Sequence, residues 1–261
     1  MTAREALAEA ERRLAAAGVE TPRVDAEWLV AHLLGTTRSG LAARLDEEVE
    51  GLEPPLARRE AREPLAYVLG EWGFRRLTLK TDARALVPRP ETETLVERAL
   101  ALVEGIEAPR ILDVGVGSGA IALALKDERP DARVTGVDVS PDALALAREN
   151  AELLGLEIEL REGDGAAAAG EGWDLVAANP PYVEELEGLQ TELRWEPEVA
   201  LVGRGEHERL ARAAKARFVV FEVGDGQARD VAAMLERLGC SEVAVTPDLA
   251  GSDRVVEGRL P

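Results

Sequence analysis

The sequence predicts an α/β protein whose main part is a doubly wound, mostly parallel sheet, preceded by a small helical domain and a β-hairpin connector. Beyond residue 110, short apolar runs alternate with amphipathic helical segments, as in parallel strands joined by crossover helices. The first of these runs, 110–114, leads directly into a glycine-rich loop that opens a helix. Before residue 64 the apolar residues have helical spacing, which predicts the separate small domain.

A chain of 261 residues is slightly longer than the size at which one core usually divides, so one large and one small domain are expected. We place the helical domain at 1–63, the connector at 64–85 and the sheet domain at 86–261. The formal charge of -19 argues against a protein that grips nucleic acid through its phosphates, because such binding needs a positive field.

The single cysteine, Cys240, excludes an internal disulfide and fits a reducing cytosol. No apolar stretch approaches membrane-spanning length. We therefore expect a cytoplasmic protein with no membrane partner.

Four helices are expected in the first domain, over residues 3–17, 22–34, 41–45 and 55–62. Thr2 and Glu5 form a capping-box pattern at the start of the first helix. Thr21 is expected to cap the second, with Pro22 in its first turn. A domain of this size is too small to hold an enzyme core alone. It is either a docking element for a substrate or a packing appendage, and the sequence leaves both open.

Strand-like alternation follows Pro64. Apolar residues at 65, 67 and 69, and again at 72, 74, 77 and 79, predict the β-hairpin. A helix carrying Leu95 and Leu102 is then expected. Its entry, 87–90, has two prolines around Arg89, so it either holds Arg89 toward a ligand pocket or simply starts the helix.

The loop after strand 110–114 carries glycines at alternate positions, Gly115, Gly117 and Gly119. Such glycines let the backbone approach a ligand closely, where any side chain would block it. The next strand ends at Asp138, 23 residues beyond Gly115, which suits a carboxylate that holds ribose hydroxyls. Nicotinamide cofactors and S-adenosylmethionine both contain that ribose, so the loop alone does not choose between them.

Polar residues follow the next two predicted strands as well. Asp164 comes after strand 158–160 and could accept from an adenine amino group or simply sit in a turn. Asn179 comes directly after strand 173–178. Because ligands of open α/β sheets bind beyond the carboxyl ends of the strands, these residues, with Gly115 and Asp138, are expected at one edge of the sheet.

The segment Asn179-Pro180-Pro181-Tyr182 has the chemistry to hold a planar nitrogen. The Asn179 side chain offers a carbonyl acceptor, and the prolines stiffen the backbone without adding N–H groups. Tyr182 adds an electron-rich face that attracts a cationic methyl donor. The alternative interpretation is a loop breaker with a chance tyrosine.

The remaining chain is expected to contain a polar segment 184–207, a buried strand 217–223, a helix 227–238, and two strands, 242–245 and 254–257, close enough to form a hairpin. His207 stands among charged residues, so we expect it to be solvated and not a catalytic base. No metal constellation, serine triad or lysine-bearing phosphate loop is present.

The chain resembles the bacterial peptide chain release factor glutamine methyltransferases, within the S-adenosylmethionine-dependent class with a seven-stranded sheet. The resemblance covers nearly the whole chain, and the segments that carry it are 63–70, 87–93, 112–122 and 179–182. Later similarities, such as Phe221-Glu222-Val223-Gly224, fall in the right order. Two departures matter: Gly165 stands where a bulky aromatic is usual, and the loop at 203–210 is shorter than usual.

The resemblance implies methylation of the side-chain nitrogen of the glutamine in the Gly-Gly-Gln loop of class I release factors. It implies catalytic roles for Asn179, Pro180 and Tyr182, and substrate binding by these three together with Pro181. The residues expected to bind S-adenosylmethionine are Gly115, Val116, Gly117, Ser118, Gly119, Asp138, Asp164, Gly165 and Asn179.

Other functions stay open on sequence. A ribosomal-protein glutamine methyltransferase would carry the same motifs. An adenine-N6 nucleic-acid methyltransferase could use Asn179 to Tyr182 for its own amine, but the strong acidity opposes it, and no direct nucleic-acid binding is expected. A nicotinamide-dependent reductase fits the glycine loop and Asp138 yet leaves Asn179 to Tyr182 unexplained.

Overall fold

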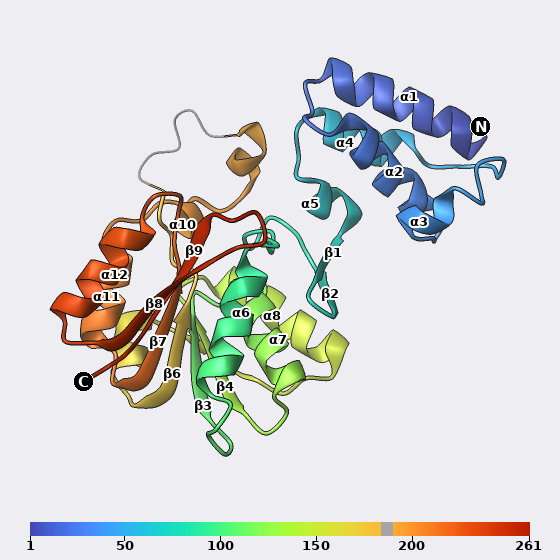
Figure 1. The fold of residues 1–261 in the computed structure, drawn as a ribbon. Coiled ribbons are helices and arrows are strands. Elements are labelled where there is room, and N and C mark those ends of the chain that lie inside the picture. Colours follow the sequence, from blue (N-terminus) through green and yellow to red (C-terminus); the bar gives the residue numbers. More distant parts are fainter. Residues whose placement is uncertain (184–189) are drawn as a thin grey trace. The chain divides into compact units, whose positions relative to one another are not determined.

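The computed structural model describes residues 1–183 and 190–261 (Figure 1). The chain divides into two compact units. The helical unit comprises Met1–Glu71 and a later segment, of which 190–195 is described. The sheet unit holds the rest of the chain from Trp72 onward.

The helical unit contains α1 (Ala3–Ala16), α2 (Pro22–Leu33), α3 (Arg38–Leu41), α4 (Glu53–Glu60), α5 (Leu65–Leu69) and the 3-10 turn η1 (Thr191–Trp195). The capping box is confirmed: the Thr2 hydroxyl accepts from the Glu5 backbone, and the Glu5 carboxylate accepts from the Thr2 backbone. Thr21 does not cap α2, because its hydroxyl donates instead to the Asp25 carboxylate at 2.8 Å.

Two further differences from the expected elements have local causes. Helix α3 begins at Arg38, earlier than expected, because the Thr37 hydroxyl caps it by accepting from the Gly40 backbone. Residues 65–69, expected in the hairpin connector, form the helix α5, which ends at Gly70 in a left-handed conformation. The hairpin itself is β1 (Glu71–Phe74) and β2 (Leu77–Lys80).

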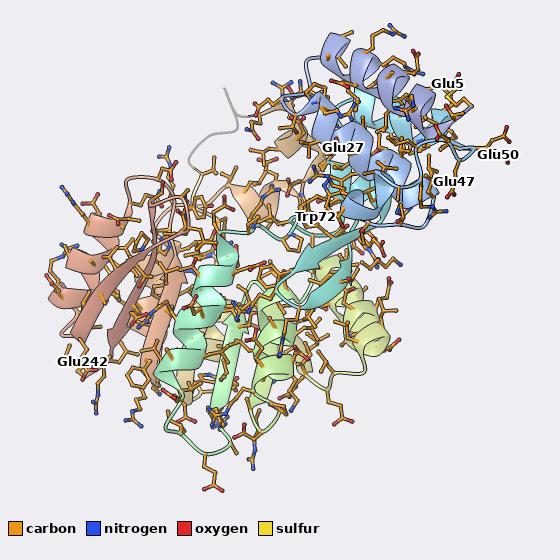
Figure 2. The ribbon with its side chains drawn as sticks, turned by 45° about the vertical axis from the view of Figure 1, so that its right-hand side comes forward. Glu5, Glu27, Glu47, Glu50, Trp72 and Glu242 are labelled. Carbon is orange, nitrogen blue, oxygen red and sulfur yellow. The ribbon has the colours of Figure 1, made fainter. Side chains whose placement is uncertain are left out.

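A buried ion network ties the later segment to the helices of its own unit. The Arg59 guanidinium, on α4, donates to the Asp25 carboxylate at 2.7 Å and to the Glu192 carboxylate at 2.9 Å. Arg62 donates two hydrogen bonds to the same Glu192 carboxylate. Asp25 and Arg59 are almost fully buried. In contrast, the labelled Glu5, Glu47 and Glu50 lie on the outer surface of this unit (Figure 2).

The sheet unit is built on a seven-stranded sheet with strand order β5-β4-β3-β6-β7-β9-β8. Its strands are β3 (Arg110–Val114), β4 (Arg133–Asp138), β5 (Glu159–Glu162), β6 (Trp173–Ala178), β7 (Ala216–Glu222), β8 (Ser241–Pro247) and β9 (Asp253–Arg259). Strands β3 to β7 are parallel, whereas β9 runs antiparallel to β7 and pairs with β8, as the expected hairpin. The predicted doubly wound, mostly parallel sheet is confirmed.

Helices cover both faces of this sheet (Figure 1). One face packs against α6 (Thr92–Leu102), α7 (Ala120–Glu128) and α8 (Pro141–Leu154). The other face packs against α9 (Gly165–Ala169), α11 (Glu206–Ala213) and α12 (Ala228–Arg237). A short helix, α10 (Glu198–Leu201), precedes α11.

Alternate residues of each strand supply the two cores, as the period of a strand requires. In β6, Leu175 and Ala177 face the core with α6, while Val176 and Ala178 face the core with α11 and α12. None of the helices that the structure describes is long and apolar enough to cross a lipid bilayer.

Candidate active site

The parallel register brings the expected strand ends together at one edge. Val114, the last residue of β3, lies opposite Val137 of β4 and Ala178 of β6, and Ala178 lies opposite Phe221 of β7. The residues that follow these positions are therefore neighbours. They are Gly115, Asp138, Asn179 and Glu222.

A cavity of about 340 Å³ opens at this edge. That volume lies within the range of small-molecule pockets. Of the residues predicted to bind a cofactor or substrate, those that line it are Gly115, Val116, Gly117, Ser118, Asp138, Gly165, Asn179, Pro180 and Pro181. Arg89 and Thr92 also contribute to the lining. A larger depression at the opposite ends of the strands, beside Arg110 and Trp173, contains none of the predicted residues.

The glycine loop is held in its shape by side chains of the sheet unit. Gly115 and Gly117 have φ of 74° and 53°, the left-handed region that favours glycine. The Asp138 carboxylate accepts from the Gly117 N–H at 3.0 Å and from the Ser140 N–H at 2.9 Å. The buried Asn150 donates to the Ser118 carbonyl at 2.9 Å. The loop is therefore preorganised.

Asp113 lies beneath the glycine loop and is fully buried. One of its oxygens accepts from the Ala122 N–H at 3.0 Å, while the other has no partner among the described residues. Burial raises the pKa of Asp113 to about 7, and the nearby Asp138 charge acts in the same direction. Asp113 thus supports the start of α7 and does not line the cavity.

Asn179 extends from β6 toward the first turn of α6. Its Nδ2 atom lies 3.4 Å from the Thr92 hydroxyl oxygen. Its side chain also lies beside the carboxyl group of Glu222, which follows Phe221 at the end of β7. Asn179 lines the cavity, and among the described residues no hydrogen bond reaches its Oδ1 atom.

Pro181 and Tyr182 are held in place by contacts with Gly203 and Gln227. The Gly203 backbone lies so close to Pro181 that an added Cβ would stand 2.6 Å from the Pro181 carbonyl oxygen. The Gln227 side chain donates to the Tyr182 carbonyl at 3.2 Å. Within the part of the chain that the structure describes, no hydrogen bond reaches the Pro180 carbonyl oxygen. A rigid segment thus presents this oxygen and Asn179 Oδ1.

Tyr182 is not among the cavity-lining residues. Its ring lies against Gly224, where an added Cβ would come within 2.9 Å of it. Burial raises the pKa of its phenol to about 12, so the ring is neutral. Its predicted contact with a methyl donor stays a prediction.

Gly119 and Asp164 do not line the cavity either. Gly119, with φ of 88°, packs against Leu123. The Asp164 carboxylate caps α9 through the Ala166 N–H and pairs with Arg209 at 2.7 Å. The Arg209 guanidinium holds the pKa of Asp164 below its usual value. Its predicted contact with adenine stays a prediction.

The unusual Gly165 has a steric reason. An added Cβ would stand 2.1 Å from a methyl group of Val114, so α9 packs directly on the end of β3. A bulky side chain at this position would require α9 to shift.

Thr92 and Glu222 were not predicted as site residues. Glu222 ends an apolar strand, which is the signal that singled out Asp138 and Asn179. The expectation of a solvated His207 is wrong: its side chain is buried, and its Nε2 atom lies 2.8 Å from the Glu222 carbonyl oxygen. Burial lowers the pKa of His207, which keeps it neutral at pH 7.

Comparisons with known proteins agree with this geometry. Residues 5–70 match the model of the PrmC N-terminal domain, and residues 92–202 match that of the methyltransferase small domain. The release factor glutamine methyltransferase of Rhodospirillum rubrum is 42% identical over 95% of this chain and 82% of its own. That of Deinococcus radiodurans is 40% identical over 99% of both chains.

Among solved structures, the hMettl16 catalytic domain has a TM-score of 0.59 at 14% identity and covers 80% of this chain and 82% of its own. This likeness shows the fold alone. The sheet order, the cavity at the carboxyl ends of the strands and the matched methyltransferase domain together define an enzyme of the methyltransferase class with a seven-stranded sheet. Its sequence places the chain in the release factor glutamine methyltransferase family.

Proposed function

We propose that this enzyme methylates the side-chain amide nitrogen of the glutamine in the Gly-Gly-Gln loop of class I peptide chain release factors. The names of its relatives support the substrate. The observation that carries the chemistry is a pair of acceptors to which no described residue donates a hydrogen bond, Asn179 Oδ1 and the Pro180 carbonyl oxygen, on a rigid segment at the cavity.

An amide nitrogen is a poor nucleophile because its lone pair is shared with the carbonyl group. The enzyme must therefore orient it and stabilise the positive charge that grows on it during attack. Asn179 Oδ1 and the Pro180 carbonyl oxygen would each accept one N–H bond from the substrate amide, which fixes the direction of the lone pair. No general base is required before methyl transfer, since the nitrogen's proton becomes acidic only as the new bond forms.

The cavity fits the cofactor S-adenosylmethionine. Gly115 lines the cavity, and a Cβ added to it would meet no atom of the described residues within 4 Å, so the backbone there leaves room for a ligand. When bound, S-adenosylmethionine supplies the methyl group. Gly115 and Gly117 would lie against it, and Asp138 would accept from its ribose hydroxyls with the lone pairs that the loop does not use.

We expect Gly115→Ala to weaken S-adenosylmethionine binding more than tenfold, because the new methyl group would occupy the cavity. Gly155→Ala is a matched control: Gly155 has a similar φ of 64°, an equally open Cβ direction, and a place at the end of α8. Both variants strain the backbone by on the order of 1 kcal/mol. Calorimetry that finds equal losses of affinity in the two would contradict the assignment of this loop.

The helical unit is proposed to dock the release factor, and its place in the chain supports this. Its segment at 190–195 follows the Asn179 to Tyr182 segment closely in sequence and returns to the sheet unit at Glu196. There, the Glu196 carboxylate accepts from the Val87 N–H at 3.0 Å and pairs with Arg89.

We further propose that the enzyme acts in the cytoplasm, where release factors work.

The substrate class is tested with labelled S-adenosylmethionine and three acceptors in parallel, which are a class I release factor, ribosomal protein and DNA. We expect label in the release factor alone. Label in ribosomal protein would assign the alternative glutamine substrate. Label in DNA would favour an adenine-N6 methyltransferase and overturn the proposal.

A further inference from the structure

We propose that Glu222 is a positioning residue for methyl transfer: together with Thr92 it fixes the Asn179 side-chain amide with its oxygen toward the substrate. This inference rests on the proposed function, because it concerns the same amide-binding site. Glu222 itself does not line the cavity and would act only through Asn179.

Strand register places the two side chains on one face. Ala178 and Phe221 are partners in the parallel pair β6–β7, and both face the core with α11 and α12. The next residues, Asn179 and Glu222, therefore point to the opposite face, where α6 begins. Thr92, the first residue of α6, completes the group.

The direction of the hydrogen bonds decides what Asn179 can do. A carboxylate accepts hydrogen bonds and donates none, so Glu222 selects the Nδ2 atom of Asn179 as its neighbour. Nδ2 also lies within reach of the Thr92 oxygen. Oδ1 is then left to face the cavity. In the flipped amide, Nδ2 would face the substrate N–H groups, two donors would meet, and the substrate could not be held.

Protonation of Glu222 would remove this selection, because a neutral carboxyl group can donate to Oδ1. The carboxyl group is almost fully buried, and one of its oxygens has no described partner. Its pKa is raised to about 7, mainly by burial and in smaller part by the charge of Glu91. Hydrogen bonds from Thr92 and Asn179, and the charge of Arg254, lower it in part.

Two more titratable groups lie near Glu222 and do not change charge with it around pH 7. Tyr182 stays neutral because its own pKa is raised to about 12. His207, on α11, contacts the Glu222 backbone, and its pKa is lowered. Asp113, beneath the glycine loop, also has a pKa raised to about 7. A titration of activity near pH 7 is therefore assigned to Glu222 only if Glu222→Gln removes it.

The test compares the single-turnover rate of the wild type and Glu222→Gln on a release factor between pH 6 and pH 8. We expect the wild-type rate to fall about tenfold from pH 8 to pH 6. Glutamine has the same size but can donate as well as accept, so at pH 8 the variant should be slower by on the order of 10- to 100-fold. Its rate should show no titration near pH 7. Calorimetry should find its S-adenosylmethionine affinity unchanged.

A double-mutant cycle shows whether Glu222 acts through Asn179. In an Asn179→Ala background, Glu222→Gln should cause no further loss. Glu257→Gln is the matched control, since Glu257 is also a buried glutamate of the sheet but pairs with Arg98 away from the rim. The Glu257→Gln variant should lower the free energy of unfolding and leave the rate of methyl transfer unchanged.

The inference would be overturned if Glu222→Gln kept the wild-type rate and pH dependence. It would also be overturned if the losses from Asn179→Ala and Glu222→Gln added in the double variant. Failure of the proposed function is distinguishable, because the wild type itself would then leave the release factor unmethylated. A readout without activity is also available. The pKa of Glu222 is higher in the folded protein than in the unfolded chain, so ionising it costs free energy in the folded state. The protein therefore loses stability as the pH rises from about 5 through 7. Glu222→Gln should therefore raise the melting temperature at pH 8 and not at pH 5.

Discussion

Asn179→Ala is expected to lower the single-turnover rate of methyl transfer by about 10²- to 10³-fold, the loss typical of one positioned hydrogen-bonding group. The reason is geometric. Its Oδ1 atom is one of the two proposed acceptors for the substrate amide, and the Pro180 carbonyl oxygen alone would not fix the direction of the nitrogen lone pair. The affinity for S-adenosylmethionine should change much less, as calorimetry can check.

Asn179→Asp is the informative partner of this variant. It keeps an acceptor and should therefore retain more activity than alanine. The Glu222 carboxyl group beside it disfavours a second carboxylate, so part of its activity should be lost as well. If Asn179→Ala turns over at a near-normal rate with saturating cofactor and release factor, the proline carbonyls act alone and the assignment fails.

Asp25→Ala is expected to destabilise the helical unit by about 3 to 5 kcal/mol, the cost of removing one partner from a buried ion pair. Arg59 is 5% exposed and, among the described residues, would keep only Glu192 as a carboxylate partner. The Thr21 hydroxyl would lose its acceptor as well. Hydrogen exchange followed by mass spectrometry should show faster exchange in α1, α2 and α4, with β3 to β7 unchanged.

Arg4→Ala is the control for this effect. Arg4 also pairs with an aspartate, Asp46, but both side chains are exposed, at 66% and 93%. Its loss should change stability by less than about 1 kcal/mol. If Asp25 and Arg4 variants are equally stable, the buried network does not hold the unit together. S-adenosylmethionine binding by the sheet unit should survive in both.

The order of strands and helices could be predicted because each element has a local signal. Apolar runs mark β3, β4, β6 and β7, and the glycine loop marks the point where β3 meets α7. The rule that ligands bind beyond the carboxyl ends of parallel strands then placed Asp138 and Asn179 beside Gly115, as the register confirms. These predictions need only one element and its neighbours in sequence.

Side-chain direction and burial could not be predicted, because they depend on which distant segment packs alongside. His207 stands among charged residues in sequence, yet α11 turns it inward against β7. Glu222 is recognised as a site residue only from the register of β6 and β7, which places it beside Asn179 although the two are 43 residues apart in sequence. Pro181 lines the cavity, but the next residue, Tyr182, does not. Its ring packs against Gly224, which has no side chain to exclude it.

Tandem mass spectrometry of the methylated release factor tests the central claim most directly, because it locates the methyl group on a single side chain. After incubation with the enzyme and S-adenosylmethionine, we expect the mass of one methyl group on the side-chain amide of the glutamine in the Gly-Gly-Gln loop. A variant release factor with that glutamine replaced by asparagine should remain unmodified. A methyl group on any other residue, or equal modification of the variant, would contradict the account.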